Sequence, residues 1–351
     1  MHWTKEGHKK FNKALYDSFI LGGDIGGTNS RLGVFGLKNV FPELLISFTF
    51  KSMEIGNFHD VINEVLSLVK EEHNLTITKA CFGVAGVVSP DRKSAEIRKL
   101  GCSLSSKSLV KKTSLKQAIF INDFQAIGYG INMVKKSQLA VIKKGSKAPR
   151  SNILVIGAGT GLGKSLLIFD ENKKFYQPVA SEGGHTDFPA QTAEEIKIVE
   201  FIKKHMNIRS VPYERMLSGP GLGNIYLYLK KSGRFRQSKY TKEIDKSSYN
   251  PQMISKYRKL DKACRSAFEI FKEAYAKFAR NMALDGLSLG GVYIAGGIAQ
   301  KNIDIFDSRF VKAFEHGSDM PHILKKMPVY IILDDNIGLL GAGFAGARML
   351  R

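Results

Sequence analysis

Two glycine-rich stretches, each lying between apolar runs, constrain the fold of this chain more than any other feature. Residues 18–37, "SFILGGDIGGTNSRLGVFGL", and residues 152–169, "NILVIGAGTGLGKSLLIF", both have the pattern of strand, glycine turn and strand. Glycine lets backbone amides approach a ligand closely, and a threonine hydroxyl adds a donor. A single turn of this kind is common in α/β proteins. Two of them, about 133 residues apart, predict a duplicated fold that holds a polyphosphate from both sides.

The second turn also matches the loose pattern of a Walker A loop, because Ala158 is followed, after four residues, by Gly163-Lys164-Ser165. In a true Walker A loop these last residues open a helix, whose first amides hold the phosphates. Here the chain continues as "LLIFDENKKFYQPVA", two strand-like runs around a charged turn. We therefore expect Lys164 to be a strand residue and not a phosphate ligand.

The chain is long and basic, with 351 residues, 43% of them hydrophobic, and a net charge of +21. This length supports two domains with their own cores. No apolar run reaches the roughly 20 residues of a membrane helix. The first 18 residues lack the apolar centre of a secretory signal, and the three cysteines form no CxxC pair. We expect a cytoplasmic protein. The basic excess attracts polyanions, but it is spread along the chain without a nucleic-acid-binding signature, so nucleic acid and membranes are not expected partners.

Three further motifs combine polar residues with glycine or with the end of an apolar run. "AIFI" ends at Asn122-Asp123, where either residue can cap the helix predicted next. "SEGGHTDFPA" places Glu182 and His185 around two glycines, but without HExxH or cysteine partners a zinc site is not expected. "GGVYIAGGIAQ", residues 290–300, predicts a strand, a tight turn and a helix.

Taken together, eight blocks in a fixed order resemble the bacterial-type glucokinase family of the sugar kinase, actin and heat-shock ATPase superfamily. They extend from about Phe19 to about Gly346 and read "GGDIGGTNSRLGVF", "CFGVAGVV", "INDFQAIGYGI", "GAGTGLGKSLL", "SEGGHTDFPA", "YERMLSGPGLGNIY", "GGVYIAGGI" and "DDNIGLLGAG". The resemblance implies an α/β, two-domain ribonuclease H-like fold of the actin and hexokinase type with an interdomain cleft. We expect a basic extension over 1–17, a small α/β domain over 18–133 plus 335–351, and a large α/β domain over 134–334.

The resemblance also implies roles for individual residues. Asp123 would be the general base, and Asp24 would hold Mg²⁺ through water. The sugar-binding residues would be Asn122, Asp123, Glu182, His185 and Glu214. The ATP-binding residues would be Gly26, Gly27, Thr28, Asn29, Gly159, Thr160, Gly161, Gly296 and Gly297.

One stretch departs from the family's pattern. After "GVAGVV" the family usually carries a Thr-Asn pair and then a tryptophan near the sugar, whereas this chain has "AEIRKLGCSLSS" at 95–106. The resemblance therefore does not indicate which sugar this chain selects. Elsewhere we expect residues 256–289 to include a long helix whose apolar stripe packs in a core or a dimer. Residues 231–252 are expected to form a loop, and the first 17 residues to be mobile.

The function that follows is ATP-dependent phosphorylation of glucose to glucose 6-phosphate with Mg²⁺, carried out by a homodimer. Two alternatives stay open. The chain is a kinase for another hexose or an N-acetylhexosamine, or it is a non-catalytic sugar-binding regulator with a basic surface for nucleic acid. Sugar-dependent ATP turnover and its sugar preference distinguish these three cases.

Overall fold

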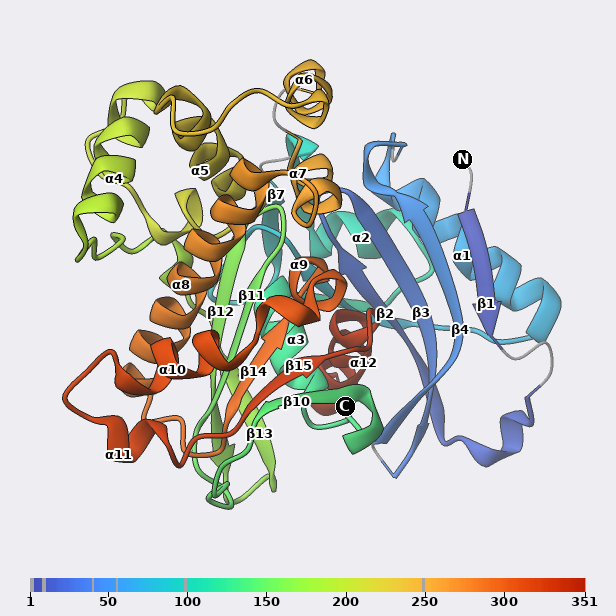
Figure 1. Cartoon of the computed structure of the whole chain (residues 1–351). Coiled ribbons are helices and arrows are strands. Elements are labelled where there is room, and N and C mark those ends of the chain that lie inside the picture. Colours follow the sequence, from blue (N-terminus) through green and yellow to red (C-terminus); the bar gives the residue numbers. More distant parts are fainter. Residues whose placement is uncertain are drawn as a thin grey trace. The chain divides into compact units, whose positions relative to one another are not determined.

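A computed structural model of the chain describes residues 3–7, 11–39, 41–54, 56–97, 100–247 and 250–350. Its contacts divide the chain into two compact units. Unit 1 comprises Met1–Lys136, Asp170–Ala180 and Asp334–Arg351, and unit 2 comprises Ser137–Phe169 and Ser181–Leu333. Figure 1 labels their helices and strands. Within the described residues, no helix combines the length and the apolar character needed to cross a bilayer.

Unit 1 is built on a six-stranded mixed sheet in the order β1-β4-β3-β2-β5-β9. Its strands are β1 (Trp3–Gly7), β2 (Ser18–Ile25), β3 (Asn29–Lys38), β4 (Phe41–Lys51), β5 (Lys79–Val84) and β9 (Gln117–Asn122). β2 and β3 form the antiparallel hairpin predicted at the first glycine turn, and β5 and β9 continue the sheet parallel to β2. A separate three-stranded sheet contains β6 (Val87–Val88), β7 (Ser94–Ile97) and β8 (Cys102–Ser105).

The helices of unit 1 are α1 (Phe58–His73), α2 (Ser106–Lys112), α3 (Asp123–Gly130) and α12 (Ile337–Met349), and β13 (Phe175–Val179) also belongs to this unit. Asn57 caps α1 by accepting a hydrogen bond from the His59 amide, and the helix ends at Asn74 in the left-handed conformation. α12 is apolar around most of its circumference and packs against α3, β2 and β5 (Figure 1). The glycines of α12 allow this close approach, so the C-terminal segment is part of the core of unit 1.

Unit 2 repeats the strand pattern of unit 1. The strands of its sheet that belong to unit 2 are, in order, β10 (Leu139–Lys143), β15 (Val329–Ile332), β14 (Val292–Ala295), β11 (Ile153–Ala158) and β12 (Leu162–Asp170). β11 and β12 form an antiparallel hairpin, and β14 and β15 follow parallel to β11. An antiparallel hairpin followed by two parallel strands is therefore common to both units, which confirms the duplication predicted from the two glycine turns.

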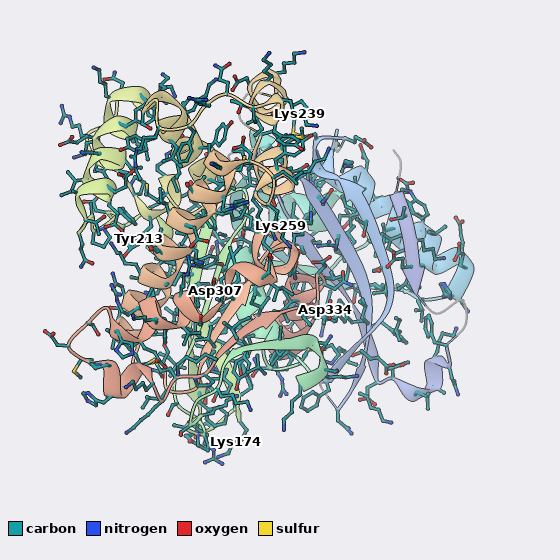
Figure 2. All side chains as sticks on the ribbon, in the orientation of Figure 1. Lys174, Tyr213, Lys239, Lys259, Asp307 and Asp334 are labelled. Atoms are coloured by element: carbon teal, nitrogen blue, oxygen red, sulfur yellow. The ribbon has the colours of Figure 1, made fainter. Side chains whose placement is uncertain are left out.

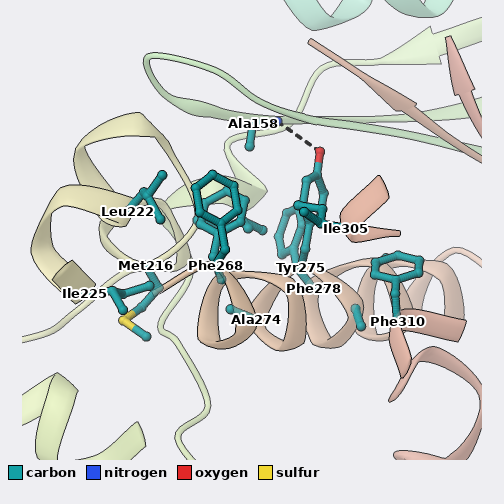
Figure 3. Close-up of a cluster of buried hydrophobic side chains, with 14 of the residues drawn as sticks. Ala158, Met216, Leu222, Ile225, Phe268, Ala274, Tyr275, Phe278, Ile305 and Phe310 are labelled. Carbon is teal, nitrogen blue, oxygen red and sulfur yellow. Dashed lines mark hydrogen bonds between the residues drawn. The ribbon is translucent and has the colours of Figure 1, made fainter. Parts of the chain in front are cut away.

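The helices of unit 2 surround a large apolar core. They are α4 (Ala193–Met206), α5 (Gly219–Lys231), α6 (Lys239–Lys246), α7 (Pro251–Tyr257), α8 (Lys262–Asp285), α9 (Gly297–Lys301), α10 (Ser308–His316) and α11 (Pro321–Leu324). α8 is the long helix predicted within 256–289, and its buried stripe includes Phe271, Tyr275 and Phe278. Figure 3 shows Tyr275 and Phe278 packing with residues of other elements of unit 2. The stripe is core within this chain.

Two predictions about irregular segments are wrong. The segment 231–252 contains α6, which Ser238 caps and which buries Thr241 and Ile244; Lys239, labelled in Figure 2, is its first residue. The N-terminal extension is not simply mobile, because β1 pairs with β4 and Trp3 packs edge-on against Phe48. Residues 1, 2 and 8–10 of that extension lie outside the described residues.

Candidate active site

The tip of the first hairpin is a tight turn that the buried Ser52 stabilises by hydrogen bonds. The Gly26 amide donates to the Asn29 carbonyl at 3.2 Å. Ser52, which is 1% exposed, donates its amide to the Thr28 carbonyl at 3.0 Å and its hydroxyl to the Gly26 carbonyl at 2.6 Å. Thr28 and Asn29 are exposed. The predicted phosphate ligands of this hairpin therefore lie together on one turn that is stabilised by hydrogen bonds.

Asp24 stands at the end of β2, just before that turn. Its Oδ2 lies 3.7 Å from the Arg31 guanidinium, and its side chain is 22% exposed. Burial raises the pKa of the Asp24 carboxyl, and the Arg31 charge opposes that rise. The first turn of α12 passes so close that a Cβ on Gly338 would lie 2.9 Å from Oδ2. Gly338 thus makes room for the carboxylate beside the positive end of a helix.

Asn122 and Asp123 lie where β9 passes into α3, on the same sheet edge as Asp24. Asn122 caps the helix, because its Oδ1 accepts from the Phe124 amide at 2.9 Å and the Gln125 amide at 3.3 Å. This capping engages Oδ1, and the side-chain Nδ2 is a hydrogen-bond donor. Asp123 is the first residue of α3, and its Oδ1 accepts from Phe124 at 3.0 Å.

The separation of the two aspartates follows from the sheet. β2, β5 and β9 are adjacent and parallel, with Ile25 paired to Val84 and Val84 paired to Asn122. Their carboxyl ends therefore share one edge, and two strand spacings together with an offset of two residues along the strands put the α-carbons of Asp24 and Asp123 roughly 12 Å apart.

The second hairpin is anchored by three elements of unit 2. The Ala158 amide donates to the Tyr275 hydroxyl at 3.1 Å, drawn as the dashed line in Figure 3. The Gly159 carbonyl accepts from the Gly219 amide at the start of α5, at 2.8 Å, and the Leu162 amide donates to Glu214 Oε2 at 2.9 Å. The turn itself closes with a bond of 2.8 Å from the Gly159 amide to the Gly161 carbonyl.

Lys164 is a strand residue, as predicted. It lies in β12 opposite Ile156, and its ammonium is 2.9 Å from Asp285 Oδ2 at the end of α8. The chain after Gly163 is a strand and no helix begins there. The Walker A match is therefore accidental.

The three predicted sugar ligands of unit 2 lie on two neighbouring turns. Glu182 precedes the 3₁₀ turn Gly183–His185, and its Oε2 lies 3.8 Å from His185 Nε2, with both side chains largely exposed. Gly184 is needed here, because a Cβ would lie 2.1 Å from the Leu162 carbonyl. The Tyr213 amide donates to the Thr186 carbonyl at 2.9 Å, which joins this turn to the 3₁₀ turn Tyr213–Arg215 that carries Glu214.

Gly296 and Gly297 form the turn between β14 and α9. Gly296 has φ of 93° and a Cβ there would lie 2.9 Å from the Ala158 carbonyl, so glycine is required on both counts. The predicted nucleotide residues of unit 2 therefore lie side by side, on the β11–β12 turn and the β14–α9 turn.

The structure thus gathers the predicted residues into one group in each unit. Unit 1 holds Asp24, the first hairpin, Asn122 and Asp123, and unit 2 holds the second hairpin, Glu182, His185, Glu214 and the Gly296-Gly297 turn. Sequence reasoning missed the supports of these groups, namely Ser52, Gly338 and Tyr275. Gly338 stands inside the quoted block "DDNIGLLGAG", but neither Ser52 nor Tyr275 belongs to a motif that marks it.

Comparisons with known proteins identify the family of this chain. A family model described as glucokinase matches residues 21–349. A glucokinase from Nostoc sp. is 33% identical over 347 residues, covering 95% of this chain and all of that protein. The crystal structure of a glucokinase from an Antarctic psychrotroph aligns with a TM-score of 0.79 at 27% identity, over 94% of this chain and 99% of that one.

A more distant structure extends the likeness of fold. The ROK family glucokinase from Streptomyces griseus, solved with glucose and AMPPNP, aligns with a TM-score of 0.63 at 17% identity, over 94% of this chain and 100% of that one. These alignments confirm the two-domain ribonuclease H-like fold. With a family model matching nearly the whole chain and a full-length relative at 33% identity, the chain belongs to the glucokinase family.

Proposed function

We propose that this chain transfers the γ-phosphoryl group of ATP to the 6-hydroxyl of glucose. The observation that carries the proposal is the hydrogen bond from the Leu162 amide to Glu214. It joins a glycine hairpin suited to phosphates to a carboxylate that, with Glu182 and His185, suits sugar hydroxyls. Membership of the glucokinase family supports the same assignment.

In the proposed reaction, Asp123 accepts the proton of the sugar hydroxyl as its oxygen attacks the γ-phosphorus and ADP leaves. Asn122 Nδ2, Glu182, His185 and Glu214 orient the sugar by hydrogen bonds to its hydroxyl groups. An epimer that leaves one of these bonds unmade would lose on the order of 1–3 kcal/mol. The amides of the two hairpin turns donate to the phosphate oxygens.

The residues near Asp24 fit a magnesium ion that is bound mainly through water. Among the described residues, no three His, Cys, Asp or Glu side chains gather as a metal cage. Mg²⁺ in phosphoryl-transfer sites commonly takes one or two carboxylates together with waters and substrate phosphates. Asp24 is such a carboxylate. When bound, Mg²⁺ supplies positive charge to the phosphate oxygens.

A coupled assay of ATP turnover against glucose, mannose and N-acetylglucosamine tests the reaction. We expect the highest kcat/KM with glucose, and preference for another of these sugars would revise the substrate. Absence of turnover with every sugar, together with salt-sensitive DNA binding, would favour the regulator.

Asp123→Asn tests the role of the base, because the amide keeps a hydrogen-bond acceptor for Phe124 but cannot take a proton. We expect kcat to fall by about 10²–10⁴ while glucose binding, measured by calorimetry, is retained. Glu71→Gln, an exposed carboxylate on α1, is the matched control. Near-normal kcat in Asp123→Asn would place the base elsewhere.

The homodimer and the cytoplasmic location remain predictions.

A further inference from the structure

Two 3₁₀ turns of unit 2, Gly183–His185 and Tyr213–Arg215, carry or adjoin the proposed sugar ligands and are named the sugar turns. The segments beside them pair with each other, because Asp187 forms an antiparallel β-bridge with Pro212. The position of one sugar turn relative to the other therefore depends on what holds this pairing in place.

Asn281, a half-buried residue of α8, holds the second sugar turn. Its Nδ2 donates to the Tyr213 hydroxyl at 2.8 Å. Tyr213, labelled in Figure 2, is 2% exposed, and its ring centroid lies 4.8 Å from that of Phe278 on the same helix. Glu214, the next residue, is a proposed sugar ligand. One hydrogen bond and one ring contact from α8 therefore fix the chain just before Glu214.

Lys277 lies one helical turn before Asn281 and holds the segment that follows the first sugar turn. Its ammonium donates to the Pro189 carbonyl at 3.2 Å and lies 5.1 Å from the centre of the Phe188 ring. That ring packs edge-on against Tyr213. Because side chains four residues apart share one face of a helix, a single face of α8 contacts the segments beside both sugar turns.

The Lys277 ammonium is held in place by a buried carboxylate. Lys277 is 7% exposed, and it donates to the two carboxylate oxygens of Glu195 at 2.6 and 2.7 Å. Glu195 in turn accepts from the amides of Gln191 and Thr192 at 2.8 and 3.0 Å. Separating a buried ion pair is strongly unfavourable, so the segment 189–192 stays fixed to α8.

We propose that Lys277 and Asn281 are positioning residues for sugar recognition, which set the distance between the side chains of His185 and Glu214. Binding sites need their side chains held to within about 0.5 Å by surrounding hydrogen bonds. Both residues act through the segments beside the sugar turns and are not themselves proposed ligands. The inference rests on the proposed function, because it takes His185 and Glu214 as sugar ligands.

Asn281→Ala tests this role against Asn152→Ala, a control matched in the donor group and its distance. Asn152 Nδ2 donates at 2.8 Å to the carbonyl of Gly286 at the end of α8, which is not part of either sugar turn. Both variants are expected to lower the free energy of unfolding in urea by similar amounts. Only Asn281→Ala is expected to raise the Kd for glucose, measured by calorimetry, by about two- to tenfold. Equal glucose Kd values in the two variants would overturn the proposal.

Two further variants separate positioning from loss of stability. Asn281→Asp is expected to keep the wild-type Kd for glucose, because its carboxylate accepts from the Tyr213 hydroxyl. A rise as large as in Asn281→Ala would contradict the proposal. Tyr213→Phe removes the other partner of the same bond, so the effects of Tyr213→Phe and Asn281→Ala on the glucose Kd should not add in the double variant. Additive effects would also contradict it.

Lys277→Met is compared with Lys272→Met, a change to another buried lysine of α8. Lys272 is 2% exposed and pairs with Glu269 at 2.8 Å and Asp307 at 3.0 Å. Both variants lose a buried cation, and only Lys277→Met is expected to raise the glucose Kd. Circular dichroism checks that each is folded, and the Asn281 variants decide the proposal where a lysine variant is not.

Calorimetry needs no turnover, so this test is separate from the kinase assay. Weaker glucose binding in Asn281→Ala than in Asn152→Ala would support the positioning role even without ATP turnover, which would refute the proposed kinase reaction alone. Wild type that binds no glucose would overturn the proposed function and the positioning role together.

Discussion

Substitution of Glu214 is expected to weaken the binding of both ATP and glucose, because the same carboxylate holds the second hairpin and is a proposed sugar ligand. Its Oε2 accepts the Leu162 amide of the second hairpin at 2.9 Å, and it is also a proposed sugar ligand. Glu214→Ala removes the acceptor and leaves a buried backbone amide without its charged partner. We therefore expect the KM for ATP and the KM for glucose to rise together.

The size of the effect follows from the bond that is lost. A hydrogen bond to a charged group contributes about 1.5–3 kcal/mol, and about 1.4 kcal/mol corresponds to a factor of ten in rate. The kcat/KM for ATP should therefore fall roughly 10- to 150-fold if the whole free energy of this hydrogen bond stabilises the transition state. Water entering the space left by the side chain would bring the value toward the lower end.

Steady-state kinetics with each substrate varied in turn provide the assay. Glu182→Ala is the matched control, because Glu182 is a proposed sugar ligand whose largely exposed side chain contacts no hairpin amide among the described residues; it should raise only the KM for glucose. Gly161→Ala should reproduce part of the Glu214→Ala effect, since its Cβ would lie 2.6 Å from Glu214 Oε2. If Glu214→Ala raises the glucose KM alone, the hairpin does not depend on this bond.

Three other changes test individual contacts within unit 2. Tyr275→Phe leaves the amide at the base of the second hairpin unpaired and should lower the free energy of unfolding in urea by about 1–3 kcal/mol; no loss would mean that the amide finds another acceptor. Gly184→Ala would place a Cβ 2.1 Å from the Leu162 carbonyl, so the KM for glucose should rise at least about tenfold at a packing cost of about 1–3 kcal/mol. Burial alone would raise the pKa of Glu195, but hydrogen bonds led by that from Lys277 hold it below its usual value. The pair therefore contributes its full stabilisation above the pKa of Glu195 in the unfolded chain, near 4.5, and this stabilisation is lost as the pH falls through the lower pKa of the folded protein. Urea titrations between neutral and acidic pH should show that the free energy of unfolding depends less on pH in Glu195→Gln than in wild type.

The elements that could be predicted from the sequence are those with a local signal. The glycine turns between apolar runs predicted both hairpins, and the 3.6-residue spacing of apolar side chains predicted α8, because burial of one face imposes that period on the residues themselves. The strand-like run after Ser165 also excluded the Walker A loop. By contrast, β1 is exposed along most of its length, and of the two residues that α6 buries, Thr241 and Ile244, only one is apolar, so few apolar residues mark either element in the sequence.

The sequence by itself determined the candidate ligands and the kind of chemistry that they suit. Only the tertiary structure decided how those ligands are held. The Ser52 hydroxyl reaches Gly26 across 26 residues, Glu214 accepts from Leu162 across 52, and Tyr275 accepts from Ala158 across 117. Bonds over such separations form when folded elements pack together, and no local preference of either residue records them. The supports of the site therefore became visible only once the strands and helices of each unit were in place.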